Sequence, residues 1–256
     1  MPGSVNNTFN NNVLWQASLF PVPVPQCGTI YIWHGITAEL LHLYTNCYLL
    51  LNGAEQNRAE RYFRLADRQR YVIQHGLLRL LLGWYLKTTV FDGIYTQGGH
   101  GKPYLPNYDI HPGFFNLSNS AGEFLIAIGD TELGVDIEYL KPWFAWQDIA
   151  SRYFGANELD YIAGSENPVE AFFLLWTRKE ALLKATGEGI DDDLLQIPAL
   201  NGQHALPVNY NNTHWLTASF KAESNSIMSV AYRYPISLQL IHLEAGMVLQ
   251  GINEVG

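Results

Sequence analysis

Two carboxylates one residue apart are the first feature that could do chemistry. Asp136 and Glu138 lie in the short stretch 133–138, which is rich in β-branched residues and is predicted to be a strand. Residues i and i+2 of a strand point to the same face, so both carboxylates project together while Val135 and Ile137 turn toward apolar packing. Adjacent carboxylates repel each other unless a cation lies between them, and oxygen ligands favour magnesium. The alternative is a strand end at which two acids face solvent.

A third carboxylate and a lysine lie on a predicted helix over 168–186. Asn167 precedes this helix as a cap, and Gly187 is placed to end it. Glu180 and Lys184 are four residues apart and therefore share one face. They indicate either part of a binding site or a surface ion pair worth a few tenths of a kcal/mol.

Three further groups could hold phosphate. Lys102 lies in a rigid Gly-Lys-Pro loop, and Ser118 follows a predicted strand, where its hydroxyl and backbone N–H groups could bind an anion. Each is also compatible with an ordinary turn. The third group is a cluster of arginines that favours a phosphate-binding surface or, alternatively, a solvated helix face. Its members are Arg58, Arg61, Arg64, Arg68, Arg70 and Arg79.

Composition restricts the classes of protein. The chain has 256 residues, 48% hydrophobic and 15% charged, which is typical of a globular protein. Its net charge of −9 argues against a nucleic-acid partner. No run approaches the roughly 18–20 apolar residues that span a bilayer, and residues 1–12 lack the pattern of a signal peptide. Cys27 and Cys47 have no metal-ligand spacing, so we expect a cytoplasmic protein without a membrane partner.

The pattern of apolar and turn residues predicts an α+β protein with mostly antiparallel strands and helices packed on them. Residues 1–26 are expected to be a flexible tail, and the last dozen residues to be weakly structured. The loop at 97–103 follows from its Gly and Pro content. Strands are predicted at 29–34, 114–117, 123–128, 133–138, 214–221, 227–233 and 237–243, and helices at 37–50, 54–64, 67–87, 145–153, 156–163 and 168–186.

The order and spacing of these groups resemble the Sfp-type 4′-phosphopantetheinyl transferase family. The resemblance runs from about residue 58 to about residue 189. Its most specific part is GVDIE (134–138) followed by WxxKExxxK (176–184). The other motifs are the arginine-rich region, the GKP loop (101–103), FNLSNSAG (115–122) and the remainder of FFLLWTRKEALLKATGEGI (172–190).

The resemblance implies a fold of two similar halves related by a pseudo-twofold, with coenzyme A in the cleft between them. We expect the halves at 27–140 and 141–256. The resemblance also implies roles for individual side chains. It assigns Asp136, Glu138 and Glu180 to magnesium. Lys184 is assigned to the pyrophosphate and, together with Glu180, to catalysis. Coenzyme A phosphates are assigned to Lys102 and Ser118, the 3′-phosphate side to Arg58 and Arg70, and a structural role to Arg79.

The implied reaction moves phosphopantetheine from coenzyme A to a serine of an apo acyl or peptidyl carrier protein, releasing adenosine 3′,5′-bisphosphate. Glu180 or a metal-bound water would take the serine proton. We expect a monomer. Fatty-acid, polyketide and nonribosomal-peptide carriers all remain open. After the GVDIE strand, Trp143, Phe144 and Trp146 are candidates for an apolar docking edge, with core packing as the alternative.

One residue departs from the family pattern. The family has Ser-His-Ser where this chain has Ser118-Asn119-Ser120, and that histidine contacts a coenzyme A phosphate. Asn119 can donate a hydrogen bond but carries no charge, which would cost ~1–3 kcal/mol of affinity unless another cation compensates. The departure keeps open a non-catalytic module that binds coenzyme A or carrier proteins. A metal-dependent phosphodiesterase or nuclease is a further alternative, since it would explain the three carboxylates alone.

Overall fold

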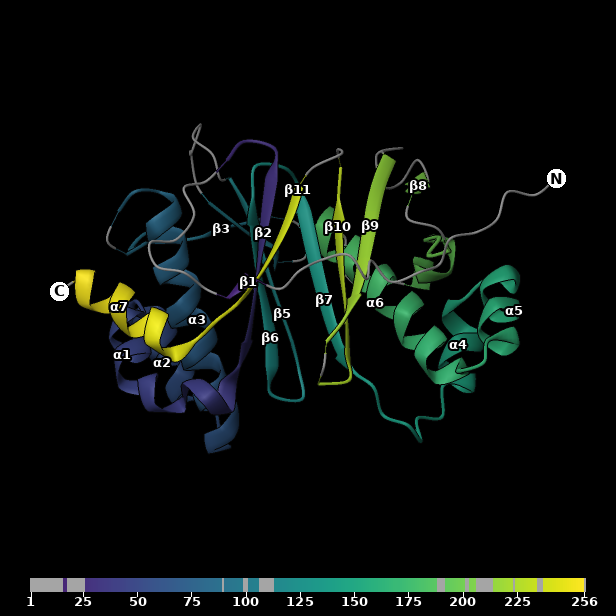
Figure 1. The fold of residues 1–256 in the computed structure, drawn as a ribbon, viewed down its shortest axis with the longest axis horizontal. Coiled ribbons are helices and arrows are strands. Elements are labelled where there is room, and N and C mark those ends of the chain that lie inside the picture. The colour runs from purple at the N-terminus through teal and green to yellow at the C-terminus, as the bar shows by residue number, and fades with distance from the viewer. Residues whose placement is uncertain are drawn as a thin grey trace.

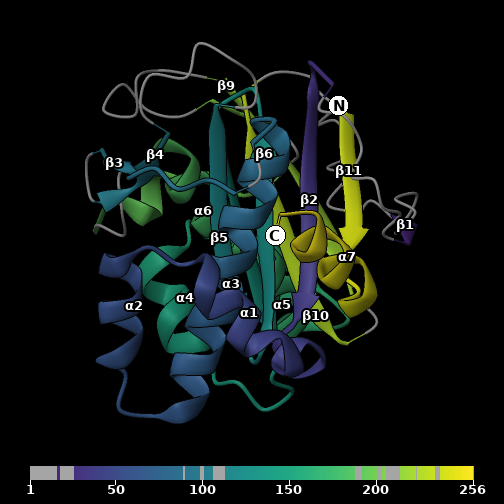
Figure 2. The same ribbon diagram turned by 90° about the vertical axis from the view of Figure 1, so that its left-hand side faces the viewer.

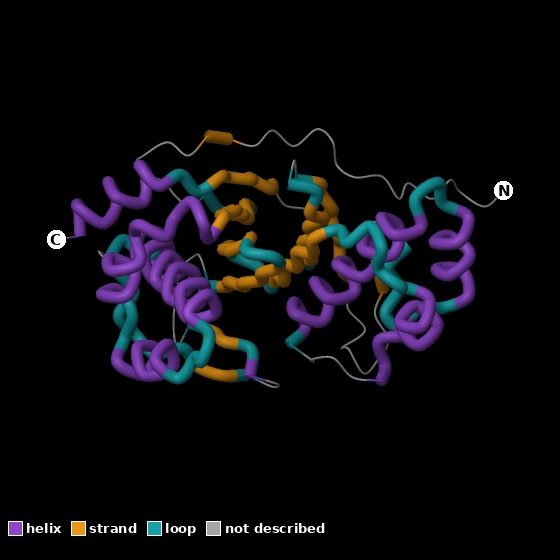
Figure 3. Tube along the Cα trace, turned by 90° about the horizontal axis from the view of Figure 1, so that it is seen from below, coloured by secondary structure: helices purple, strands orange, loops and turns teal. Residues whose placement is uncertain are grey.

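The computed structural model describes residues 16–17, 26–88, 90–98, 101–105, 113–187, 192–200, 203–205, 214–222, 224–233 and 237–255. Two sheets lie in the middle of the molecule, and helices cover the outer side of each (Figures 1 and 3). The prediction of an α+β fold with mostly antiparallel strands is confirmed.

The first sheet has five strands in the order β1-β11-β2-β6-β5. They are β1 (Gln16–Ala17), β11 (Ser237–His242), β2 (Thr29–Ile36), β6 (Glu123–Gly129) and β5 (Phe114–Ser120). Helices on this side of the molecule are η1 (Thr37–Leu43), α1 (Tyr44–Leu50), α2 (Gly53–Glu60), α3 (Leu65–Tyr85) and α7 (Ala245–Val255) (Figure 2).

The second sheet has four strands in the order β7-β10-β9-β8. They are β7 (Leu133–Tyr139), β10 (Ser226–Tyr232), β9 (His214–Lys221) and β8 (Gln203–Ala205). The helices of this side are α4 (Gln147–Tyr153), α5 (Ala156–Gly164), α6 (Pro168–Thr186) and η3 (Asp192–Gln196). A separate two-stranded hairpin, β3 (Thr96–Gln97) with β4 (Pro103–Tyr104), occupies part of the predicted loop.

The two sheets repeat one topology. In each, a first strand is followed by helices and then by a hairpin whose second strand inserts beside the first, giving β2-β6-β5 and β7-β10-β9. β7 therefore belongs with the second sheet, although the expected boundary at residue 140 put it in the first half. β11 and α7, expected in the second half, return to the first sheet and its helices. The division between sheets thus falls before β7, because the nonlocal pairing of β7 with β10 decides it.

Apolar side chains fill three layers. One core lies between the first sheet and its helices, around Trp33 and Leu81, and another lies between the second sheet and α4–α6, around Phe172. The third lies between the two sheets, where Ile32 of β2 meets Val135 of β7 in one cluster. The sheets are therefore held face to face by burial of apolar surface.

Two expectations about the chain ends need correction. Residues 245–255 form α7, which buries Met247 and Val248 against the first core, so the prediction of a weakly structured end was wrong. Gln16 and Ala17, expected in a flexible tail, pair with β11 as a parallel strand. The remainder of the tail up to residue 25 lies outside the described residues.

The described helices include none that combines the length and the apolar character needed to cross a membrane.

Candidate active site

A ladder of side chains joins the two sheets where β5 and β7 meet. Every second residue of β5 reaches a partner on β7, because side chains of a strand alternate between faces. The three contacts are Val135 N–H to Asn116 Oδ1 (2.9 Å), Ser118 Oγ–H to Asp136 Oδ1 (2.9 Å) and Ser120 Oγ–H to Glu138 Oε2 (2.7 Å). These contacts between β5 and β7, called the seam below, thus fix both carboxylates of the GVDIE strand.

Gly134 lets helix α6 lie directly on β7. A side-chain carbon at Gly134 would be 2.2 Å from the carbonyl oxygen of Ala181 and 2.3 Å from the amide nitrogen of Ala185. This close approach brings Lys184 to the seam, where its Nζ donates to Asp136 Oδ1 (2.7 Å) and to Ser118 Oγ (2.8 Å). Strand and helix therefore assemble one group of side chains from residues far apart in the sequence.

Two carboxylate oxygens in this group have no partner. Asp136 is 4% exposed and Glu180 is 8% exposed, and Asp136 Oδ2 and Glu180 Oε1 are both buried without a hydrogen bond. Burial raises the pKa of Glu180 to about 7, the charge of Asp136 adds to this shift, and Lys184 opposes it. Burial likewise raises the pKa of Asp136 and of Glu138. Asp136 Oδ2 and Glu180 Oε1 therefore lack donors, although Lys184 and Ser118 donate to Asp136 Oδ1 and Ser120 donates to Glu138 Oε2.

This donor set fits a hard cation, since unpartnered carboxylate oxygens are the ligands that magnesium takes. The carboxylates are not, however, gathered into a preformed cage. Within the described part of the chain, no group of three or more His, Cys, Asp or Glu side chains is placed to hold a metal ion. The ammonium of Lys184 supplies the positive charge at Asp136 instead.

Lys102 has partners other than those expected. Its Nζ is buried and donates to two main-chain carbonyls, Ala185 O (2.7 Å) and Leu133 O (3.2 Å), and burial lowers its pKa to about 8. The lysine thus ties the GKP loop to the end of α6 and the start of β7. These contacts point to a positioning role for Lys102, and its assignment to a coenzyme A phosphate stays a prediction.

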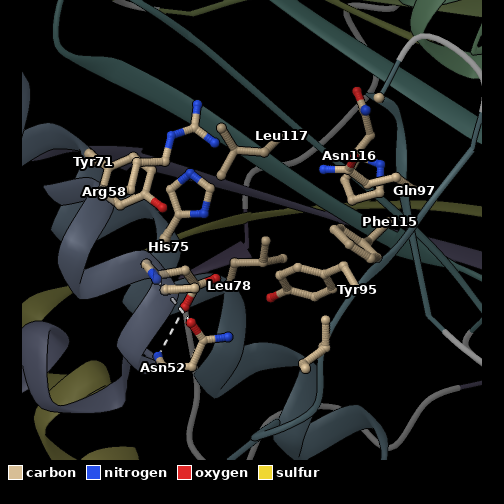
Figure 4. Close-up of a pocket in the computed structure, with 15 residues that line it drawn as sticks. Asn52, Arg58, Tyr71, His75, Leu78, Tyr95, Gln97, Phe115, Asn116 and Leu117 are labelled. Carbon is tan, nitrogen blue, oxygen red and sulfur yellow. Dashed lines mark hydrogen bonds between the residues drawn. The ribbon is translucent and has the colours of Figure 1, made fainter. Parts of the chain in front are cut away.

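A cavity of about 430 Å³ adjoins the seam. Figure 4 shows Arg58, His75 and Leu117 together on one side and Tyr95 with Phe115 on another. The guanidinium of Arg58 lies over the ring of Tyr71, 5.3 Å from its centroid. The polar lining residues are Asn52, Glu55, Arg58, Tyr71, His75, Tyr95, Gln97 and Asn116. The space combines a cation with aromatic and apolar walls.

Three other predicted residues, Arg70, Arg79 and Asn119, are not among the residues that line this cavity. Arg70 is not among its lining residues and pairs with Asp67 (2.8 Å) on the surface of α3. Arg79 is fully buried and is bound by Glu55 and by the carbonyl oxygens of Phe91 and Gly93. Asn119 is exposed and shares a face of β5 with Leu117.

The three aromatic residues after β7 divide between surface and core. Trp143 is 96% exposed, whereas Phe144 and Trp146 are half-buried and pack against the core around Phe172. Only Trp143 of the three presents its whole ring to a partner.

Sequence reasoning missed His75 and Tyr95 as members of the site. His75 lies one turn after Tyr71 on α3, in a stretch whose other side chains are almost all buried. A polar residue on the apolar face of an amphipathic helix is the signal that could have found it.

Known proteins with similar sequences decide the family. The sequence model of the 4′-phosphopantetheinyl transferase superfamily matches residues 132–236. A putative 4′-phosphopantetheinyl transferase of Synechocystis sp. is 34% identical over 176 residues, which cover 66% of this chain and 72% of that protein. The chain belongs to the 4′-phosphopantetheinyl transferase superfamily. The resemblance seen in the motifs is thereby confirmed.

Two further relatives include the Sfp type. The 4′-phosphopantetheinyl transferase psf-1 of Bacillus pumilus is 30% identical over 77% of this chain and 85% of its own length. Sfp of Bacillus subtilis is 27% identical over 55% of this chain and 62% of its own length. The match to the superfamily begins just before β7 and covers α6, so it includes the strand and the helix that carry the carboxylates and Lys184.

Proposed function

We propose that this protein transfers the 4′-phosphopantetheine group of coenzyme A to a serine of an apo acyl or peptidyl carrier protein, with magnesium, and releases adenosine 3′,5′-bisphosphate. The observation that carries the proposal is the group at the seam of β5, β7 and α6. There Lys184 bridges Asp136 and Ser118 beside two buried carboxylate oxygens without partners. An acid cluster that binds a cation, together with a lysine, can stabilise the negative charge that develops in phosphoryl transfer.

Asp136, Glu138 and Glu180 would hold the magnesium ion. When bound, the ion would neutralise negative charge on the pyrophosphate of coenzyme A and favour departure of the leaving group. Lys184, 30% exposed at its side chain, would contact the same pyrophosphate and stabilise charge on the bridging oxygen.

In the proposed step the carrier serine Oγ attacks the β-phosphorus of coenzyme A. A serine–phosphorus bond forms as the bond from that phosphorus to the bridging oxygen breaks, and adenosine 3′,5′-bisphosphate leaves with the bonding electrons. Glu180 would receive the proton of the serine.

The adenosine end of coenzyme A is proposed to lie in the cavity between α3 and β5. Arg58 supplies positive charge there, and Tyr95 and Phe115 supply aromatic surface of the kind that binds a base. The active form is proposed to be a monomer.

Intact mass of an apo carrier protein, measured after incubation with coenzyme A and magnesium, tests the proposal. We expect a gain of one phosphopantetheine that disappears when a chelator is present. Asp136→Ala and Glu180→Ala should lower the rate at least about a hundredfold. Glu170→Ala is the matched control, because Glu170 lies on the same helix but pairs with Lys221 at the surface.

The alternatives give different results in the same assay. Coenzyme A binding without transfer to any of several carriers would favour a non-catalytic binding module. Coenzyme A cleavage without an acceptor protein would favour a phosphodiesterase. Full activity of Asp136→Ala would contradict the assigned roles.

A further inference from the structure

His75 places an unpartnered imidazole beside the cavity. Its Nδ1 is buried and has no hydrogen-bond partner, and its ring lies 4.1 Å from that of Tyr71 between centroids. Burial lowers the pKa of His75 to about 4, and the charges of Arg58 and Arg79 add to the shift, so the ring is neutral near pH 7. A buried polar atom left without a partner requires an explanation, and a ligand that enters the cavity is one.

Arg58 is the arginine among the residues that line the cavity. Its guanidinium rests on the ring of Tyr71, and within the described residues it pairs with no carboxylate. Figure 4 shows Arg58 and His75 side by side, with Leu117 next to them. An unpaired guanidinium next to an imidazole is suited to a phosphate, which accepts hydrogen bonds from both.

Strand β5 separates this wall from the carboxylate group. Ser118 and Ser120 face β7, whereas Phe115 and Leu117 face the cavity. A phosphate beside His75 is therefore different from the pyrophosphate proposed to lie at Lys184. Coenzyme A carries both kinds of group, a pyrophosphate and a terminal 3′-phosphate.

We propose that His75 acts with Arg58 to bind the 3′-phosphate of coenzyme A and so selects coenzyme A over 3′-dephospho-coenzyme A. The inference rests on the proposed function. A dianionic phosphate favours the protonated ring and opposes the effect of the two arginines. His75 thereby supplies, from α3, the imidazole that position 119 of β5 lacks.

Calorimetric titration with coenzyme A and with 3′-dephospho-coenzyme A tests this role. We expect His75→Phe to weaken coenzyme A binding about tenfold or more and to leave 3′-dephospho-coenzyme A binding within about twofold. His75→Gln keeps a hydrogen-bond donor and should fall between wild type and His75→Phe. His42→Gln is the matched control, because His42 is exposed and does not line the cavity.

Circular dichroism and thermal melting of each variant separate lost binding from lost folding. If His75 had only a structural role, His75→Phe would weaken the binding of both ligands to the same extent. Equal losses for the two ligands, or no loss for either, would overturn the inference. Failure of the wild-type protein to bind either ligand would overturn the proposed function as well.

Discussion

At the scale of single residues, a buried neutral histidine makes folding sensitive to acid. The folded pKa of His75 is lowered to about 4, while an unfolded histidine titrates near 6.5. Between these values the unfolded chain binds more protons, so stability falls as pH drops from about 6.5 toward 4. At pH 5 this single group costs roughly 2 kcal/mol relative to pH 8.

Urea unfolding at pH 8 and pH 5 measures this cost. His75→Phe removes the titrating ring, so its loss of stability between the two pH values should be about 2 kcal/mol smaller than that of wild type. His42→Gln should behave as wild type. An identical pH dependence in His75→Phe and wild type would show that the ring is not buried neutral.

Position 119 allows the opposite experiment, adding a ring instead of removing one. Asn119 is exposed and follows Leu117 on the cavity face of β5. Asn119→His should strengthen coenzyme A binding about fivefold by calorimetry, because a histidine can carry charge toward a phosphate. Asn119→Gln, which adds no charge, should leave the affinity unchanged. Weaker binding by Asn119→His would contradict this expectation.

The residue scale is also where sequence reasoning gave its most mixed results. The i, i+2 spacing predicted that Asp136 and Glu138 share a face, and the structure gives them parallel partners, Ser118 and Ser120. The hydrogen-bond partners of Lys102 could not be predicted from such a spacing. Whether a loop lysine reaches a phosphate or a carbonyl depends on how close the loop comes to α6, which no local pattern encodes.

At the scale of elements, the packing of α6 on β7 depends on one glycine. An added methyl group at Gly134 would meet main-chain atoms of Ala181 and Ala185. Because neither atom can move without shifting the helix, Gly134→Ala should cost about 3 kcal/mol of stability and should move Lys184 from Asp136. Gly164→Ala is the control, since a methyl group at the end of α5 meets nothing within 4 Å.

Chemical unfolding and the carrier-mass assay together check this prediction. Gly134→Ala should lose both stability and transferase rate, while Gly164→Ala should retain both. Wild-type stability in Gly134→Ala would mean that α6 and β7 are not in direct contact at this point.

Lys102 provides a second test at this scale. Lys102→Met keeps the length of the side chain but leaves the carbonyls of Ala185 and Leu133 without their donor. We expect a loss of roughly 2 kcal/mol in stability, with the coenzyme A dissociation constant changed less than threefold. A large loss of affinity at unchanged stability would instead support Lys102 as a phosphate ligand.

Helix boundaries were predictable where local signals set them. Asn167 accepts from the backbone of Glu170, and Gly187 adopts a φ of 78°, so α6 begins and ends as predicted. α7 was missed because two glycines lower its intrinsic helix propensity. Its stability comes from tertiary packing instead, with Met247 in the core and Gly251 pressed against the ring of Trp84.

At the scale of the whole molecule, the division of the chain could not be predicted from local pattern. It depends on β7 pairing with β10 and on β11 returning to β2. Both pairings join segments that are far apart in the sequence. An alternating pattern predicts a strand but does not specify which other strand it pairs with. The family resemblance predicted only that the two halves have a similar order of strands and helices.

A polar bridge adds to the apolar core between the two sheets. Glu123 of β6 accepts hydrogen bonds from Ser226 (2.6 Å) and Ser224 (2.7 Å) of the β9–β10 hairpin, and lies 2.8 Å from Nε2 of His34 on β2. Burial raises the pKa of Glu123, but the bonds from His34 and the two serines outweigh burial and leave it lowered. The carboxylate is therefore stabilised by both sheets.

Removing this bridge should weaken the whole molecule without separating its halves. Glu123→Ala leaves two buried groups, His34 and Ser226, and the exposed Ser224 without their acceptor, and we expect a loss of about 3–5 kcal/mol in urea unfolding. Ser224→Ala removes one of the bonds and should cost about 1 kcal/mol. A single transition should persist in Glu123→Ala, because the apolar layer between β2 and β7 still joins the sheets. Two separate transitions would mean that Glu123, and not this apolar layer, makes the halves fold as one unit.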